Sequence, residues 1–178
     1  MSQTGEMTFW DHLEDLRTSI FRILTVFAVA VVALFFFKGF LFDSIILAPS
    51  KSDFFMYRLL SADFSMTLVN IEVAAQFLIH MKITFIMALI VTFPYIVFEI
   101  WRFILPALYE RERKVIRGAF AFASVLFYIG VVVGYSVVFP LMLNFFSGYQ
   151  VSPDIPNTFS LTSYISLFTS LVLTFGIV

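Results

Sequence analysis

The sequence predicts an all-α, polytopic helical membrane protein with four spans in a single membrane domain of 178 residues. Two features of the composition support this prediction: 61% of the residues are hydrophobic and only 13% are charged. Soluble domains carry roughly 25% charged residues, so this chain has too little polar surface to cover a water-soluble globule. The third feature is the distribution of the charges, which leaves four long, almost uncharged stretches of a length that suits membrane spans.

These four stretches predict the spans. Their approximate bounds are 20–37, 77–98, 118–146 and 161–178. Arg22, at the start of the first span, can extend its charged end to the membrane surface, and the third span is long enough to tilt or to kink at Pro140. The last stretch is still apolar at Val178, with no aromatic or basic residue to close it, so we expect this chain to be part of a longer protein.

Lysine and arginine are distributed unevenly among the segments that connect the spans. Seven lie in the N-terminal arm and in segment 99–117, three lie between positions 38 and 76 (Lys38, Lys51 and Arg58), none lies in segment 147–160, and Lys82 lies inside a span. Cytoplasmic segments of membrane proteins are enriched in these residues. The distribution therefore predicts a cytoplasmic N-terminus, a cytoplasmic loop at 99–117, and external positions for the two remaining segments.

Segment 39–76 is predicted to form an external cap loop over the spans. Its apolar stretches 53–60 and 63–69 are each predicted to be a short helix lying in the membrane interface. Ala48-Pro49-Ser50 is predicted to be a turn that redirects the chain. Because apolar side chains are costly to leave in water, we expect this loop to pack against the outer ends of the spans.

The N-terminal arm is predicted to be an amphipathic helix on the inner membrane surface. Its apolar stripe consists of Phe9, Leu13, Leu16 and Ile20. Asp11, Glu14 and Asp15 lie off this stripe and are expected to face the cytoplasm. These carboxylates either solvate the helix or bind a cationic partner. Both interpretations stay open, because acidic residues are unexpected beside an anionic membrane surface.

A second acidic cluster, Glu110 and Glu112, lies in segment 99–117 and is interleaved with three basic residues between positions 111 and 114. Pro106 precedes it and is expected to end or kink the helix that leaves the second span. By itself, this pattern is typical of a solvated turn.

The sequence offers no pattern for catalysis or for metal binding, so no cofactor is expected and an enzyme is the least favoured class. The chain has no Cys and only two His residues, too few for a histidine metal cluster. A net charge of −1 provides no basic field for nucleic acid. Gly130 and Gly134 have the spacing that seats a neighbouring helix closely. A groove within the chain is favoured here over a dimer interface.

Several segments, in order along the chain, match motifs of one family. His12-Leu-Glu-Asp-Leu-Arg17 resembles the His-Leu-x-Glu-Leu-Arg signature of TatC proteins, the multi-span subunit of the twin-arginine protein translocase. The segment from Phe103 to Arg113, with Pro106, Tyr109 and Glu112, resembles the first cytoplasmic loop of that family. Further similarities are Leu126-Phe-Tyr-Ile-Gly130, Val138-Phe-Pro-Leu141, Ser163-Tyr-Ile-Ser166 and the position of Pro49.

This resemblance implies a receptor for the twin-arginine signal peptides of folded cargo, with six spans in the full family fold. It implies a multi-pass protein of the cell inner membrane that contacts membrane lipid, self-associates and works with TatA-like and TatB-like single-span subunits. The signal-peptide binding residues that it implies are Glu112, Asp15, Glu14, Arg17, Phe103 and Glu110. The structural residues are Pro49, Pro106, Tyr109 and Pro140.

One residue departs from the family pattern, and two other functions compete. Asp15 stands where the family usually has Glu, which keeps the charge but shortens its reach. A transporter or channel subunit is the first alternative, and it requires charged residues along a path through the membrane. A structural assembly factor is the second, and it would tolerate neutralisation of both acidic clusters.

Overall fold

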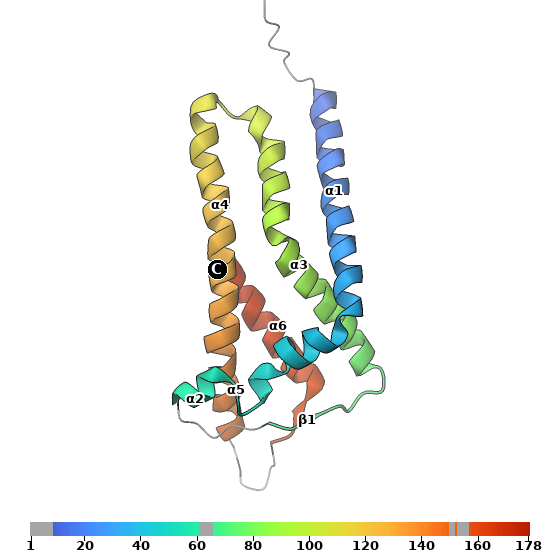
Figure 1. The fold of residues 1–178 in the computed structure, drawn as a ribbon, viewed down its shortest axis with the longest axis vertical. Helices are drawn as coiled ribbons and strands as arrows, with labels where there is room; N and C mark the ends of the chain where they lie inside the picture. The colour runs from blue at the N-terminus through green and yellow to red at the C-terminus, as the bar shows by residue number, and fades with distance from the viewer. Residues whose placement is uncertain (1–8, 61–65, 150–151, 153–156) are drawn as a thin grey trace, which may run out of the picture.

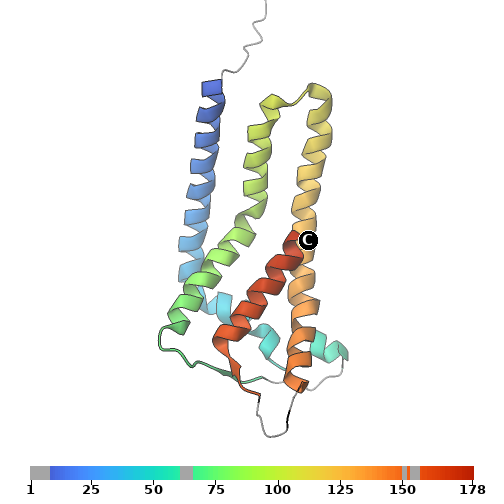
Figure 2. The same cartoon turned by 180° about the vertical axis from the view of Figure 1, so that it is seen from behind.

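The fold is known from a computed structural model, which describes residues 9–60, 66–149, 152 and 157–178. Its long helices are α1 (Phe9–Phe36), α3 (Ala75–Ile104), α4 (Glu110–Val133) and α6 (Leu161–Ile177). α1, α3 and α4 run along the long axis of the molecule (Figure 1). α6 lies between α3 and α4 and ends part-way along α4 (Figure 2). The start of α1 and the connection between α3 and α4 share one end of the bundle, which we call the connection end.

Three helical segments are long and apolar enough to cross a membrane: His12–Phe36, Ala75–Ile104 and Arg113–Gly148. The fourth predicted span corresponds to α6, a shorter apolar helix of 17 residues. The predicted class of helical membrane protein is confirmed. The described residues add one feature that the sequence did not predict, a parallel pair of two-residue strands, β1 (Leu68–Val69) and β2 (Phe159–Ser160).

The third predicted span is helical from Glu110 to Gly148, and its geometry changes near Pro140. α4 is followed by a π-helical segment, η4 (Gly134–Val138), and then by α5 (Phe139–Gly148). Proline has no N–H and crowds the carbonyl four residues earlier, and a π-turn provides a wider ring at that point. The buried positions Gly134 and Phe139 are therefore five residues apart, and Leu143 follows four residues later.

The main core lies at the opposite end of the bundle, which we call the cap end. It contains η1 (Phe40–Ile46), η2 (Ala48–Ser50) and α2 (Phe55–Leu60). Three tyrosines donate hydrogen bonds to backbone carbonyls of segment 45–49: Tyr135 to Ile45 at 2.8 Å, Tyr164 to Ile46 at 2.7 Å and Tyr57 to Pro49 at 2.7 Å. Segment 39–76 is thus tied to η4 and α6 by these bonds as well as by apolar packing.

Two predictions for segment 39–76 have different outcomes. The turn at Ala48-Pro49-Ser50 is present as the 3₁₀ helix η2, with Pro49 buried. The helix predicted at 63–69 is wrong for residues 68 and 69, which form strand β1 by pairing with β2, while residues 61–65 lie outside the described residues. The pairing with residues far along the chain determines this strand, not the local apolar pattern.

The connection between α3 and α4 is shorter than the predicted loop at 99–117. α3 continues to Ile104, a 3₁₀ helix η3 (Leu105–Ala107) follows, and α4 begins at Glu110. Pro106 lies within η3, so the predicted end of the helix near this proline is confirmed. Only Leu108 and Tyr109 lie between the helical segments, both with extended backbone.

Candidate functional site

The first turns of α1 meet the last turns of α3 at the connection end. The rings of His12 and Phe103 stack there, with centroids 4.3 Å apart and planes inclined by 20°. Because Pro106 and α4 follow directly after Phe103, this contact brings the N-terminal arm and the second acidic segment to the same end of the bundle (Figure 1).

The side chains of Glu14, Asp15 and Arg17 on α1 are all exposed. The Arg17 guanidinium carbon lies 5.6 Å from the centre of the Phe21 ring, within the range of a cation–π contact. The two carboxylates are therefore accessible to a ligand at the connection end.

The second acidic segment forms the first turn of α4. The backbone of Glu110, Arg111 and Glu112 is helical, and their side chains lie outside the described residues. Arg113 is described: its Nε donates to the carbonyl of Leu108 at 3.3 Å, and its side chain is exposed. Tyr109 is 80% exposed, so this ring is open to a ligand or to lipid.

A buried carboxylate lies one turn before Phe103 on α3. Glu99 is 2% exposed, and the Tyr95 hydroxyl donates to its Oε1 at 3.0 Å. The Arg22 Nη1 of α1 lies 3.9 Å from Glu99 Oε2, which has no hydrogen-bond partner among the described residues. α1 and α3 thus share an ion pair inside the membrane-spanning bundle.

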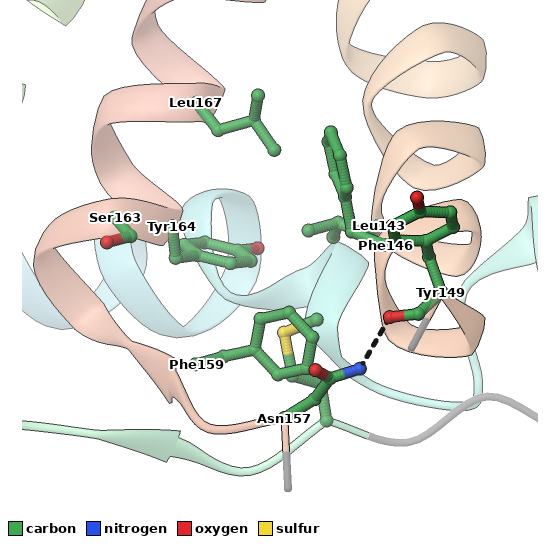
Figure 3. Close-up of a pocket in the computed structure, with 9 residues that line it drawn as sticks. Leu143, Phe146, Tyr149, Asn157, Phe159, Ser163, Tyr164 and Leu167 are labelled. Atoms are coloured by element: carbon green, nitrogen blue, oxygen red, sulfur yellow. Dashed lines mark hydrogen bonds between the residues drawn. The ribbon is translucent and has the colours of Figure 1, made fainter. Parts of the chain in front are cut away.

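A cavity of about 450 Å³ lies at the cap end, between α5 and α6. Leu143, Phe146, Tyr164 and Leu167 provide apolar walls, and the side chain of Asn157 donates to the backbone carbonyl of Tyr149 at 2.9 Å (Figure 3). No charged side chain lines it. This cavity therefore offers no carboxylate to a cationic ligand, unlike the exposed Glu14 and Asp15 at the connection end.

The family described as Sec-independent protein translocase protein (TatC) matches residues 11–178. The chain belongs to the TatC family. The matched region begins at Asp11, in the N-terminal acidic cluster, and extends through α6 to Val178.

Relatives in two bacteria illustrate the similarity of this TatC-family chain. It is 33% identical to the Sec-independent protein translocase protein TatC of Blattabacterium sp. subsp. Periplaneta americana, over 99% of this chain and 72% of that protein. It is 39% identical to the TatC protein of Escherichia coli (strain K12) over 116 residues, which are 62% of this chain and 43% of that protein. A crystal structure of the twin arginine translocase receptor TatC superposes with a TM-score of 0.72 at 27% identity, covering 93% of this chain and 69% of that one.

Glu99 is a buried residue of this TatC-family chain that the sequence pattern does not single out. The predicted second span ends at Phe98 and leaves Glu99 in a loop, whereas α3 continues for another turn and a half. A signal for its burial was present: Ala88, Thr92 and Glu99 have spacings of four and seven and lie on one helical face, which is buried at all three positions. The absence of a helix-breaking residue between Pro94 and Pro106 also indicated a longer helix.

Proposed function

We propose that this TatC-family chain is the twin-arginine signal-peptide receptor and core subunit of a translocase that exports folded proteins across the cell inner membrane. The observation that carries this proposal is the meeting of α1 and α3 at the connection end, where the His12–Phe103 stack brings the two acidic segments to the same end of the bundle. The crystal structure that it resembles is that of a twin arginine translocase receptor.

The chemistry of the ligand fits carboxylates that are open to solvent. Two guanidinium groups pair best with carboxylates, through two parallel hydrogen bonds each. We assign the primary role to Glu112, with Glu14 and Asp15 completing the acidic face and Glu110 contributing less. Arg17 and Phe103 would line the same site. The neighbouring basic residues of α4 repel an incoming arginine, although Arg113 directs its Nε to the carbonyl of Leu108.

The remaining assignments extend this proposal to the whole chain. Pro106 and Tyr109 would hold the α3–α4 connection close to the membrane, Pro49 would support the external cap, and Pro140 would shape the third span. We place the N-terminus in the cytoplasm, with spans at about 20–37, 77–98, 118–146 and 161–178. TatA-like and TatB-like subunits, a second copy of the chain and membrane lipid would surround the spans.

A transporter or channel subunit fits the distribution of charge less well. On α3, Lys82 and Glu99 lie near opposite ends, and residues 83–98 between them are uncharged. Residues 23–36 of α1 and the whole of α6 are uncharged too. The described spans therefore contain no series of charged groups that would form an ion path.

A peptide-binding assay tests the assignment of Glu112. Twin-arginine and twin-lysine peptides are titrated against the parent protein, Glu112→Gln and, as the matched control, Glu110→Gln. A hydrogen bond to a charged group contributes roughly 1.5–3 kcal/mol, so we expect Glu112→Gln to weaken twin-arginine binding by roughly tenfold to a hundredfold. It should also lose most of the discrimination against twin-lysine, and Glu110→Gln should lose less. If Glu112→Gln binds and discriminates like the parent, the assignment is contradicted, and the segment with Glu110 and Glu112 is then a solvated turn without a role in binding.

A further inference from the structure

α1 is joined to the rest of the bundle along a single seam. Among the described residues, its extensive contacts are with α3 alone. The seam is shallow: of the described side chains of α1, only Ser19 is buried. Ring contacts occur along it: His12 with Phe103 at 4.3 Å, Phe27 with Phe85 at 6.1 Å and Phe35 with His80 at 4.4 Å. Apolar surface exposed to lipid gives little driving force for helix association, so polar contacts along this seam gain importance.

The ion pair of Arg22 with Glu99 is the one salt bridge in the described part of this seam. Glu99 is almost fully buried, whereas the Arg22 side chain is 44% exposed. An attraction between opposite charges is stronger in a medium of low dielectric constant than in water. A charged residue within a span is costly unless it is paired. Both effects favour a fixed position of α1 against α3.

The location of this pair connects it to the candidate site. Asp15 lies seven residues before Arg22, about two helical turns or roughly 10 Å along α1. Glu99 lies seven residues before Pro106, after which α4 begins with Glu110. α3 therefore links the two acidic segments. The ion pair holds α3 to α1, which carries Glu14 and Asp15, and η3 connects α3 to α4, which carries Glu112.

We propose that Arg22, Glu99 and Tyr95 form an intramembrane clasp that positions Glu14 and Asp15 opposite the first turn of α4. Arg22 and Glu99 act here as positioning residues, without contact to the peptide. Tyr95 fixes one carboxylate oxygen by its hydrogen bond, which directs the second oxygen towards Arg22. The part of this inference that concerns peptide binding rests on the proposed function, whereas the part that concerns helix position does not.

A distance measurement tests the clasp directly. The chain contains no Cys, so single cysteines can be introduced and spin-labelled. Leu13→Cys and Val115→Cys are exposed positions near the starts of α1 and α4. The distance between their labels, measured by pulsed electron paramagnetic resonance, reports the separation of the two acidic segments. We expect one narrow distance distribution in the parent. Glu99→Gln keeps the shape of the side chain but removes its charge, and should broaden or shift the distribution. It should also weaken twin-arginine binding by about tenfold, the scale of a lost coupling between interacting groups.

The controls separate the clasp from a general effect on folding. Arg22→Glu combined with Glu99→Arg restores the opposite charges and should restore both the narrow distribution and the affinity. Lys82→Gln removes a charge from α3 that has no ion pair among the described residues, and should change neither. A parent-like distribution in Glu99→Gln would overturn the proposal, and so would a swapped pair that stays broad. If Glu99→Gln does not accumulate in the membrane, the distance distribution of the swapped pair alone tests the clasp: a narrow distribution supports it and a broad one overturns it. If the parent binds no twin-arginine peptide, the proposed function fails while the distances still test the clasp.

Discussion

Tyr57 illustrates how a single side chain stabilises the cap end. It is buried, and its hydroxyl donates to the carbonyl of Pro49 at 2.7 Å. Burial disfavours the charged phenolate and so raises the pKa of Tyr57 well above its ordinary value of 10.0. The neutral form, which is the hydrogen-bond donor, is therefore maintained throughout the neutral range and into alkaline solution.

Replacing Tyr57 with Phe should destabilise the protein. The change removes the donor to the Pro49 carbonyl and leaves a buried acceptor without it, at a cost of about 1–3 kcal/mol. Thermal unfolding of the detergent-solubilised protein measures the loss, with Tyr149→Phe at an exposed tyrosine as the control.

The pH dependence supplies a second measurement on the same variant. Because the pKa of Tyr57 is raised in the folded state, its contribution is present below pH 10.0 and is lost as the pH rises above that value. Tyr57→Phe should thus lose less stability than the parent between roughly pH 10 and 12. An equal loss in both proteins would show that Tyr57 does not titrate differently in the folded state.

At the scale of elements, the contact between α4 and α6 depends on glycine. A Cβ atom added to Gly130 would overlap the backbone carbonyl of Phe175 and lie 3.1 Å from the Cα of Gly176. At Gly176, an added Cβ would lie 2.9 Å from a methyl carbon of Val131. The two backbones thus approach closely because neither carries a side chain there, and the glycine spacing forms a groove within the chain, as predicted.

Gly130→Ala should therefore separate α4 from α6. Overpacking of a close contact costs about 1–3 kcal/mol, and the obstacle here is backbone, which has little freedom to move. Gly118→Ala is the matched control on the same helix, because nothing lies within 4 Å of an added Cβ. There alanine should be neutral or stabilise by about 0.5–1 kcal/mol. Protease resistance and the unfolding midpoint would report the difference, and equal values for the two variants would argue against a tight α4–α6 contact.

At the scale of the whole molecule, the two ends of the bundle differ in charge and in construction. The connection end carries exposed charges on α1 and α4, including Glu14, Asp15 and Arg113. The cap end carries η2, α2 and the β1–β2 pair, and it holds most of the buried side chains (Figure 1). The proposed orientation in the membrane rests on the larger number of Lys and Arg residues at the connection end.

Single cysteines introduced into the cysteine-free chain test the orientation. Lys51→Cys and Asn157→Cys, both exposed at the cap end, should react with a membrane-impermeant maleimide added to intact cells or spheroplasts. Arg113→Cys should react only after the membrane is permeabilised. Labelling of position 113 from outside, with protection of positions 51 and 157, would invert the topology.

Much of this arrangement was predictable, because long apolar stretches and prolines determine it locally. The uncharged runs predicted the central parts of α1, α3 and α4, and Pro106 predicted the end of α3. All three helices extend further, into charged residues at the connection end, and the N-terminal arm, predicted as a helix on the inner membrane surface, continues directly into the first span within α1. The strand pair was not predictable, because two-residue strands show no periodicity and β2 lies about 90 residues after β1. Glu99 was misplaced because charge was used to mark the end of a span, whereas its pairing with Arg22 and Tyr95 allows the carboxylate to remain inside the bundle.

The π-helical segment η4 has a consequence for changes in chain length. Each residue turns an α-helix by about 100°, so the extra residue between Gly134 and Phe139 advances the inward face by one position. A deletion of one residue within 135–138 would leave these two positions four apart, and a regular α-helix would keep both of them inward. A deletion of three residues would leave Phe139 two positions and Leu143 six positions after Gly134, and at about 100° per residue both would turn away from the inward face towards lipid. We therefore expect natural length variation in this span to favour loss of the single residue that converts the π-turn into an α-turn, and not to extend to three residues.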